Sequence, residues 1–247
     1  FNSAPNPAPR VLYSSDRAQV SKNINAYLMP APNIFLESRN KPLCDVPTMS
    51  SGGKPVDGGN LIFTAKEKVE FLTKEPAAEK YFRRFVGSDD FINGFERWCL
   101  WLVDINPREL RQLPLVVERV EAVRKFRLSS SKAATRACAD SPSRFMEIKQ
   151  PKGDFLIVPE VSSERRRYVP IGYAEGELIC SNKVRFLPNA SLYHFGILTS
   201  NVHMAWMRAV CGRLKSDYRY SKDIVYNNFP WPTPTDEQKV KIEQTAQ

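Results

Sequence analysis

The sequence has few of the residues that build metal and redox sites. It contains two histidines, His194 and His203, and no HExxH motif, so a metal site would have few ligands available. Its five cysteines are odd in number, widely scattered and without a CxxC pair. This usage favours buried, reduced thiols and predicts a cytoplasmic protein.

Long apolar runs and nucleotide-binding loops are absent as well. No run approaches the roughly 20 residues needed to span a bilayer, so no membrane partner is expected. GxGxxG, P-loop and GxSxG motifs do not occur, and the glycines of "SGGKPVDGG" (51–59) are not followed by a helical pattern. Glu147 and Lys149 form half of the ExK signature of metal-dependent nucleases, without a suitable acidic partner. Because no active site is complete, the sequence leaves open whether the chain is an enzyme.

What the sequence does have is positive charge. Its 247 residues carry 36 Lys and Arg against 27 Asp and Glu, a net charge of +9, and 42% are hydrophobic. The hydrophobic fraction predicts a globular protein with a substantial core, and the charge favours a polyanionic partner. The opening "FNSAPNPAPR" has neither an initiator Met nor the features of a signal peptide, so we expect a segment of a longer protein.

The chain divides by composition into three parts. Residues 1–59 are rich in Pro, Asn, Ser and Gly, which predicts a connector with little core of its own and one short strand at Asn33–Ser38. Residues 60–235 alternate between helical and strand patterns, and 236–247 begin another helix. We therefore predict an α+β fold, a mixed sheet with packed helices, preceded by an extended connector.

Several elements can be placed inside 60–235. Thr64 and Glu67 have capping-box spacing, and Val116, Val120 and Val123 share one face of a helix after Pro114. Strands are predicted at 155–161 and 167–173, with a third around 177–188. A helical stripe formed by Val202, Ala205, Trp206, Ala209 and Val210 predicts a buried helix face.

Three basic stretches are candidates for contact with nucleic acid. Arg165–Arg167 stand between two predicted strands, and a flexible basic loop is predicted over 125–144. Residues 212–220 interleave cations with tyrosines. Each stretch has an ordinary alternative: an ion pair with Glu164, charges that complement a helix C-terminus, or tyrosines packed in a core.

Longer motifs carry a resemblance to a known family. "FINGFERWCLWLVD", "PEVSSERRRYVPIGY", "LYHFGILTSNVHMAWMRAVCGRLKSDYRYS" and "VYNNFPWP" occur in order, and the chain resembles the MmeI-like (type IIL) restriction–modification DNA methyltransferases. In that family an adenine-specific, S-adenosylmethionine-dependent methyltransferase domain is followed by a target recognition domain. The resemblance implies that residues 1–59 are the tail of the methyltransferase domain and a connector. It implies that residues 60–235 are the target recognition domain and that 236–247 begin a C-terminal helical region.

The resemblance implies a sequence-specific module for double-stranded DNA, without a cofactor in this segment and with S-adenosylmethionine in the parent enzyme. The upstream methyltransferase domain of the same chain would be its second partner. Base-reading candidates are Arg144, Arg165, Arg166 and Arg167. Phosphate candidates are Lys132, Arg136, Arg213, Lys215 and Arg219, and stacking candidates are Tyr218 and Tyr220.

Two other functions stay open at this point: a protein–protein docking scaffold within the same enzyme and an RNA-binding module. "NNFPWP" (227–232) shares ingredients with the catalytic loop of adenine methyltransferases, but Phe229 stands where that loop has a proline. We expect Phe229 and Trp231 to fix the exit of the chain from the recognition domain. No catalytic or metal-binding residue is predicted.

Overall fold

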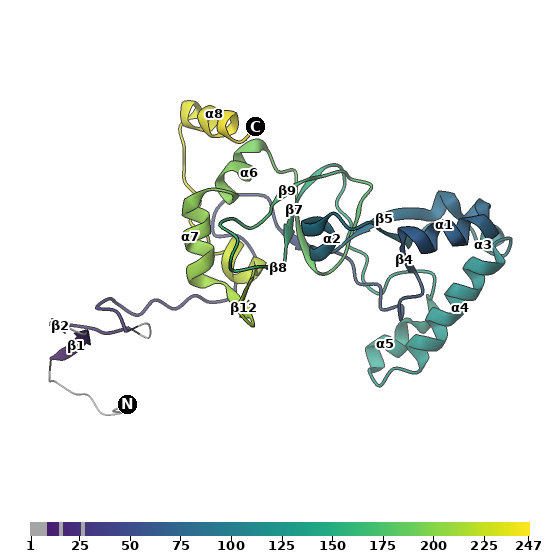
Figure 1. Ribbon diagram of the computed structural model, residues 1–247, viewed down its shortest axis with the longest axis horizontal. Helices are drawn as coiled ribbons and strands as arrows, with labels where there is room; N and C mark the ends of the chain where they lie inside the picture. Colours follow the sequence, from purple (N-terminus) through teal and green to yellow (C-terminus); the bar gives the residue numbers. More distant parts are fainter. Residues whose placement is uncertain (1–8, 15–16, 26–27) are drawn as a thin grey trace. The chain divides into compact units, whose positions relative to one another are not determined.

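The computed structural model describes residues 9–14, 17–25 and 28–247, and it forms two compact units (Figure 1). The first unit, Phe1–Ser38, contains an antiparallel pair of strands, β1 (Arg10–Ser14) and β2 (Arg17–Ser21). The strand predicted at Asn33–Ser38 is absent: these residues have no regular structure, and Phe35 is 85% exposed. The second unit, Arg39–Gln247, begins inside the segment that composition assigned to the connector.

One half of the second unit is built on a four-stranded sheet. Its order is β10 (Ile179–Cys180), β5 (Phe82–Val86), β6 (Arg97–Leu100) and β4 (Ile62–Thr64). Three helices accompany it: α1 (Ala65–Lys74), α3 (Pro107–Leu110) and α4 (Pro114–Leu128). Figure 1 shows α1 beside β4, and α3 leading into α4. Buried aromatic and aliphatic side chains of these elements form one core.

Local sequence signals explain the helices of this half. Thr64 and Glu67 form the expected capping box of α1, and Val116, Val120 and Val123 are the buried face of α4, as predicted. The start of α4 has no cap of its own. Instead, the buried carboxylate of Glu75 accepts hydrogen bonds from the Leu115 and Val116 backbone N–H groups at 2.8 and 3.1 Å. This distant cap satisfies the unpaired donors of the first helical turn.

A second four-stranded sheet and the C-terminal helices form the other half. The antiparallel order is β3 (Ser50–Ser51), β11 (Val184–Pro188), β7 (Phe155–Pro159) and β9 (Gly172–Ala174). The helical elements are α6 (Leu192–Leu198), α7 (Asn201–Val210) and the π-helix η3 (Lys222–Tyr226). A core that runs from Met49 to Trp231 holds them together.

Three predictions of local structure need correction here. The strand predicted over 167–173 is limited to β9, because residues 163–171 form a turn, a bend and irregular backbone. The buried face of α7 is His203, Met204 and Met207, whereas Val202 of the predicted stripe is 71% exposed. The expected flexible loop in 125–144 is occupied by the end of α4, α5 (Ala133–Ala137) and η2 (Cys138–Asp140).

A small three-stranded sheet completes the fold. Its order is β12 (Gly212–Leu214), β13 (Asp217–Arg219) and β8 (Val161–Ser162), all antiparallel. The remaining elements are η1 (Pro76–Tyr81), α2 (Ser88–Asn93) and α8 (Asp236–Thr245). All five cysteines are free thiols. Over the ranges that the structure describes, no helix has the length and apolar character to cross a membrane.

Candidate nucleic-acid interface

The three-stranded sheet separates the basic residues of the C-terminal half onto two faces. Strand pairing places Arg213 opposite Tyr218, and Tyr218 opposite Ser162, so these three residues share one face. Arg219 pairs with Val161, which places both on the other face. The hairpin therefore contributes to two different surfaces.

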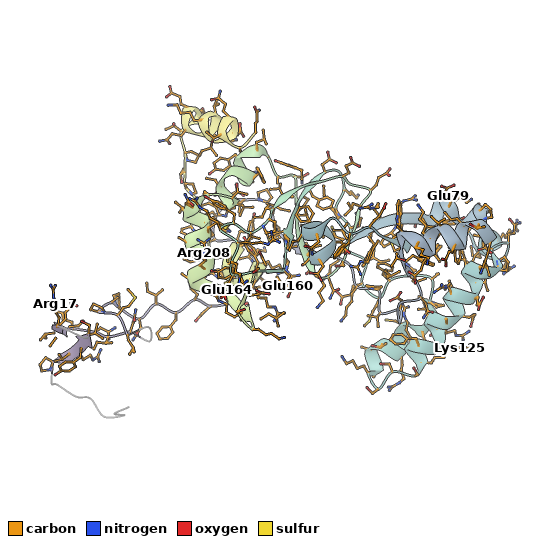
Figure 2. All side chains as sticks on the ribbon, in the orientation of Figure 1. Arg17, Glu79, Lys125, Glu160, Glu164 and Arg208 are labelled. Carbon is orange, nitrogen blue, oxygen red and sulfur yellow. The ribbon has the colours of Figure 1, made fainter. Side chains whose placement is uncertain are left out.

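The first surface holds the arginine turn predicted from the sequence. Arg165, Arg166 and Arg167 follow β8 directly, and all three are exposed. The Arg213 guanidinium lies 3.7 Å from the Glu164 carboxylate, and Arg208 of α7 donates a hydrogen bond to the Arg167 carbonyl. Figure 2 labels Glu164 and Arg208 in this region. We call the set the arginine surface: Glu164, Arg165, Arg166, Arg167, Arg208 and Arg213.

Two tyrosines expected to stack on bases are buried beneath this region. Tyr220 is 1% exposed, and its hydroxyl lies 2.9 Å from Nε2 of the fully buried His203. Burial lowers the pKa of His203 to about 3, so the imidazole is neutral. Tyr218 is 8% exposed, and the Arg213 guanidinium lies 4.1 Å from its ring centre. Since neither ring has an open face, the geometry gives the stacking prediction no support.

The second surface is a cleft of about 460 Å³. Leu214 and Arg219 of the hairpin and Val161 of β8 line one side. The other lining residues, from the α2 region, β6 and the ends of β7 and β11, are Gly87, Ser88, Asp89, Arg97, Glu160 and Lys183. We call these nine residues the interface cleft.

A buried carboxylate fixes the arginine of the interface cleft. Glu160 is 7% exposed, and its Oε1 lies 2.9 Å from both Nε and Nη2 of Arg219. Arg185 approaches Oε2 of the same carboxylate at 3.4 Å. The Arg219 side chain nevertheless remains 58% exposed. Arg219 is therefore held in orientation from below while its outer edge faces solvent.

Other groups in the cleft offer both donors and acceptors. Arg97 is paired with the buried carboxylate of Asp90, its Nε lying 2.7 Å from Oδ1. The Lys183 ammonium and the Asp89 carboxylate are exposed, and neither has a side-chain partner in the described part of the chain. The lining contains three cations and two carboxylates, so its charge is nearly balanced.

The remaining predicted contacts lie elsewhere. Lys132 is the N-cap of α5, Arg136 lies within that helix and Arg144 follows it, and all three are exposed. The Arg136 Nη1 atom donates to the Ser130 and Ser131 carbonyls, and the Arg144 carbonyl accepts from Arg127 of α4. The structure thus brings Arg165–Arg167 together with Arg213. It does not add Arg144 to that group.

Lys215 occupies the tip of the hairpin between β12 and β13. Its φ of +55° lies in the left-handed region that favours glycine. We expect Lys215→Gly to relieve this strain and leave unfolding stability unchanged or raised by up to about 1 kcal/mol. Thermal unfolding of Lys215→Gly and Lys215→Ala checks this, because alanine removes the same charge and keeps the strain. A lower melting temperature for glycine than for alanine would contradict it.

The NNFPWP segment is a structural anchor in this fold. The Asn228 carboxamide donates to the Asp223 and Ile224 carbonyls and accepts from Arg39 Nε at 2.9 Å. Phe229 and Trp231 are buried in the C-terminal core. An amide engaged in this way is not free to accept hydrogen bonds from a target adenine. In the described residues no cluster of His, Cys, Asp and Glu is suited to a metal ion.

Comparisons with known proteins identify the family of this chain. Residues 30–233 match a family model described as MmeI, target recognition domain. The chain belongs to the MmeI target recognition domain family. DNA methyltransferase A of Bacillus subtilis (strain 168) is 38% identical over 235 residues, which are 95% of this chain and 27% of that protein.

A solved structure of the type IIL restriction–modification enzyme MmeI in complex with DNA is also similar. It is 44% identical with a TM-score of 0.90, and the match covers 98% of this chain and 33% of that chain. This likeness confirms the predicted α+β fold of an MmeI-type recognition domain. The chain spans about a quarter to a third of the length of these relatives.

Sequence reasoning missed most of the interface cleft. Arg97 and Glu160 lie within the motifs quoted for the family resemblance but were not singled out, and Asp89 and Lys183 lie in no motif. Only the fold brings these four residues to Arg219. Arg208 of α7 was not among the sequence-based candidates. The one available signal was the position of Glu160, an acid inserted at the end of the apolar run "FLIVPEV".

Proposed function

We propose that this chain is the DNA target recognition module of an adenine-specific DNA methyltransferase of a restriction–modification system. Family membership supports this proposal, together with the relative that was solved in complex with DNA. The observation that carries it is the interface cleft, where Glu160 holds a half-exposed Arg219 beside further donors and acceptors.

The interface cleft has the chemistry that base reading requires. In the major groove an arginine donates to guanine, carboxylates accept from the amines of cytosine, and apolar side chains contact the thymine methyl group. Arg219, Asp89 and Leu214 supply one group of each kind. A reader must be held in orientation, and the Glu160 carboxylate holds Arg219. We therefore assign base reading to this cleft, and the sequence-based candidates Arg165–Arg167 receive a different role below.

The methyl donor of the parent enzyme would be S-adenosylmethionine, bound by another part of the protein. Gly52, in the glycine-rich stretch 51–59, has a structural reason of its own. A Cβ on Gly52 would lie 2.2 Å from the Ser181 carbonyl oxygen, so the close approach of two backbone segments accounts for this glycine. This chain would select the sequence while a separate domain flips and methylates the adenine. A cytoplasmic location is consistent with this role.

The alternative functions have less support. Burial of Tyr218 and Tyr220 removes the stacking platform on which an RNA-binding module would depend. Docking against the methyltransferase domain is compatible with DNA recognition, and the exposed Ile34 and Phe35 of the first unit are apolar groups that such a contact would cover.

We expect Arg219→Lys to relax the specificity of binding at one position of the recognised site. Lysine keeps the charge but loses the planar fork, so discrimination at that position should fall by about 1–3 kcal/mol while the salt dependence stays the same. The recognised sequence is first determined by selecting, from a pool of randomised duplexes, those that the wild-type chain binds. Dissociation constants are then compared between the selected duplex and its single-base variants, with Arg108→Lys on exposed α3 as the control.

Glu160→Gln gives the decisive comparison. If Glu160 orients a reader, the same position relaxes as in Arg219→Lys. If Arg219 contacts phosphate instead, as the sequence predicts, removing the neighbouring negative charge strengthens binding to every duplex and leaves the site unaltered. That second result would refute base reading by Arg219.

A further inference from the structure

We propose that the arginine surface binds the sugar–phosphate backbone of duplex DNA outside the base pairs that the interface cleft recognises. This inference rests on the proposed function, since it assigns a second contact of the same module. It gives Arg165, Arg166 and Arg167 a positioning role in place of the base-reading role suggested by the sequence.

Charge balance is the first argument. The arginine surface carries five arginines and one carboxylate, Glu164, which is already paired with Arg213. The lining of the interface cleft has three cations and two carboxylates. Phosphate binding draws its affinity from cations that replace condensed counterions, so it needs charge that no neighbouring acid compensates. The arginine surface has such an excess, and the interface cleft does not.

Side-chain freedom is the second argument. Among the described residues, no hydrogen bond or ion pair holds the Arg165 or Arg166 guanidinium, and Arg167 contacts only the ring of Tyr168, at 5.3 Å. Arg219, by contrast, is held through Nε and Nη2 by a buried carboxylate. Base readers need fixed geometry, whereas phosphate contacts tolerate a mobile guanidinium.

The backbone beneath these free guanidinium groups is firmly held. The Arg166 N–H donates to the Ser163 carbonyl at 3.1 Å, which closes the turn. Arg208 of α7 donates to the Arg167 carbonyl, and the Tyr168 hydroxyl donates to Asn201 at 2.8 Å. The turn is thus tied to α7 at two neighbouring residues. It presents free charges from a fixed position, as a contact that sets the register of the protein on DNA requires.

Separate faces of one sheet explain why both contacts can form. Arg213 of the arginine surface and Arg219 of the interface cleft belong to paired strands of the same hairpin, but their side chains lie on opposite faces. The two surfaces therefore do not face the same base pairs, and a duplex that contacts both has to contact them at different positions along its length. The second contact consequently lengthens the DNA footprint.

The test uses Arg165→Gln, Arg166→Gln and the double variant. Each single change should reduce the magnitude of the slope of log Kd against log salt concentration by about 0.9 and weaken binding to all duplexes uniformly. The sequence selected from randomised duplexes should stay the same. The matched control is Arg108→Gln, which removes one exposed charge from α3 and should leave the slope unchanged.

Shortened duplexes complete the test. Trimming the flanks of the selected site should weaken DNA binding by the wild-type chain more than binding by the double variant, which has already lost two of the five arginines of the arginine surface. A changed recognition sequence in either variant would make these arginines base readers, and an unchanged salt slope would remove them from the interface; both results overturn the inference. The absence of any wild-type binding to duplex DNA would instead contradict the proposed function itself.

Discussion

Replacing Arg127 by methionine should destabilise the second unit by about 3–5 kcal/mol. Arg127 lies in the last turn of α4 and is 1% exposed. Its guanidinium donates to five backbone carbonyls at 2.6–3.0 Å: Pro55, Val56, Cys138, Ser141 and Arg144. Without it, the Val56 and Arg144 carbonyls lose their donor, whereas the Pro55, Cys138 and Ser141 carbonyls each keep one backbone N–H donor. Each carbonyl left unsatisfied in the interior costs about 1–3 kcal/mol before the chain relaxes.

The carbonyls that Arg127 binds belong to two segments outside the strands and α-helices, residues 55–56 and 138–144. Residues 55–56 form a loop in which Val56 has a φ of +48°, an unfavourable conformation for a β-branched residue. Residues 138–144 lead from η2 into the chain before β7. Burial lowers the pKa of the Arg127 guanidinium, but the arginine remains charged at neutral pH. One cation thus fixes two loops against the end of α4.

Urea unfolding of Arg127→Met and Arg127→Lys measures the effect, and Arg124→Met on the exposed face of the same helix is the control. Lysine restores the charge but has three donors for five acceptors. The free energy of unfolding lost in Arg127→Lys should therefore lie between the losses in Arg127→Met and Arg124→Met. Amide exchange should increase first at 55–60 and 138–146. Equal stability of Arg127→Met and Arg124→Met would show that water satisfies these carbonyls.

Local sequence signals predicted the structure correctly wherever it depends on contacts within one helix. The capping box at Thr64 and the valine face of α4 formed as predicted, because both depend on neighbours three or four residues away. The MmeI-like family followed from long motifs that no local argument could supply.

The same local reasoning failed where distant segments decide. The stripe predicted on α7 begins with Val202, but packing against Tyr220 and Phe229 turns His203 inward instead. The sequence placed Arg127 in a flexible basic loop or at a helix C-terminus, and its burial could not be predicted because its five acceptors lie 11 to 72 residues away. The interface cleft has the same origin, since strand pairing brings Glu160 to Arg219 across 59 residues. Sequence periodicity does not contain such information.

Trp231→Ala should destabilise the C-terminal half by about 3–5 kcal/mol and leave any chemistry of the parent enzyme intact in the folded fraction. Trp231 is 7% exposed, and its ring centre lies 5.5 Å from that of Phe229, 5.7 Å from His194 and 5.8 Å from Tyr226. Its indole nitrogen has no hydrogen-bond partner among the residues that the structure describes. The loss therefore measures packing alone, and Trp231→Phe should recover part of it.

This prediction separates an anchor from a catalytic loop. Phe95→Ala, a 56%-exposed aromatic of the same unit, is the control and should change stability by less than about 0.5 kcal/mol. Methylation by the full-length protein is measured per folded molecule, with the folded fraction taken from thermal unfolding. Loss of methylation in Trp231→Ala at unchanged stability would assign the segment to catalysis. We expect instead a loss of stability with methylation per folded molecule unchanged. The Asn228 carboxamide is hydrogen-bonded to Arg39, Asp223 and Ile224, and the two aromatic residues that follow it are buried in the core.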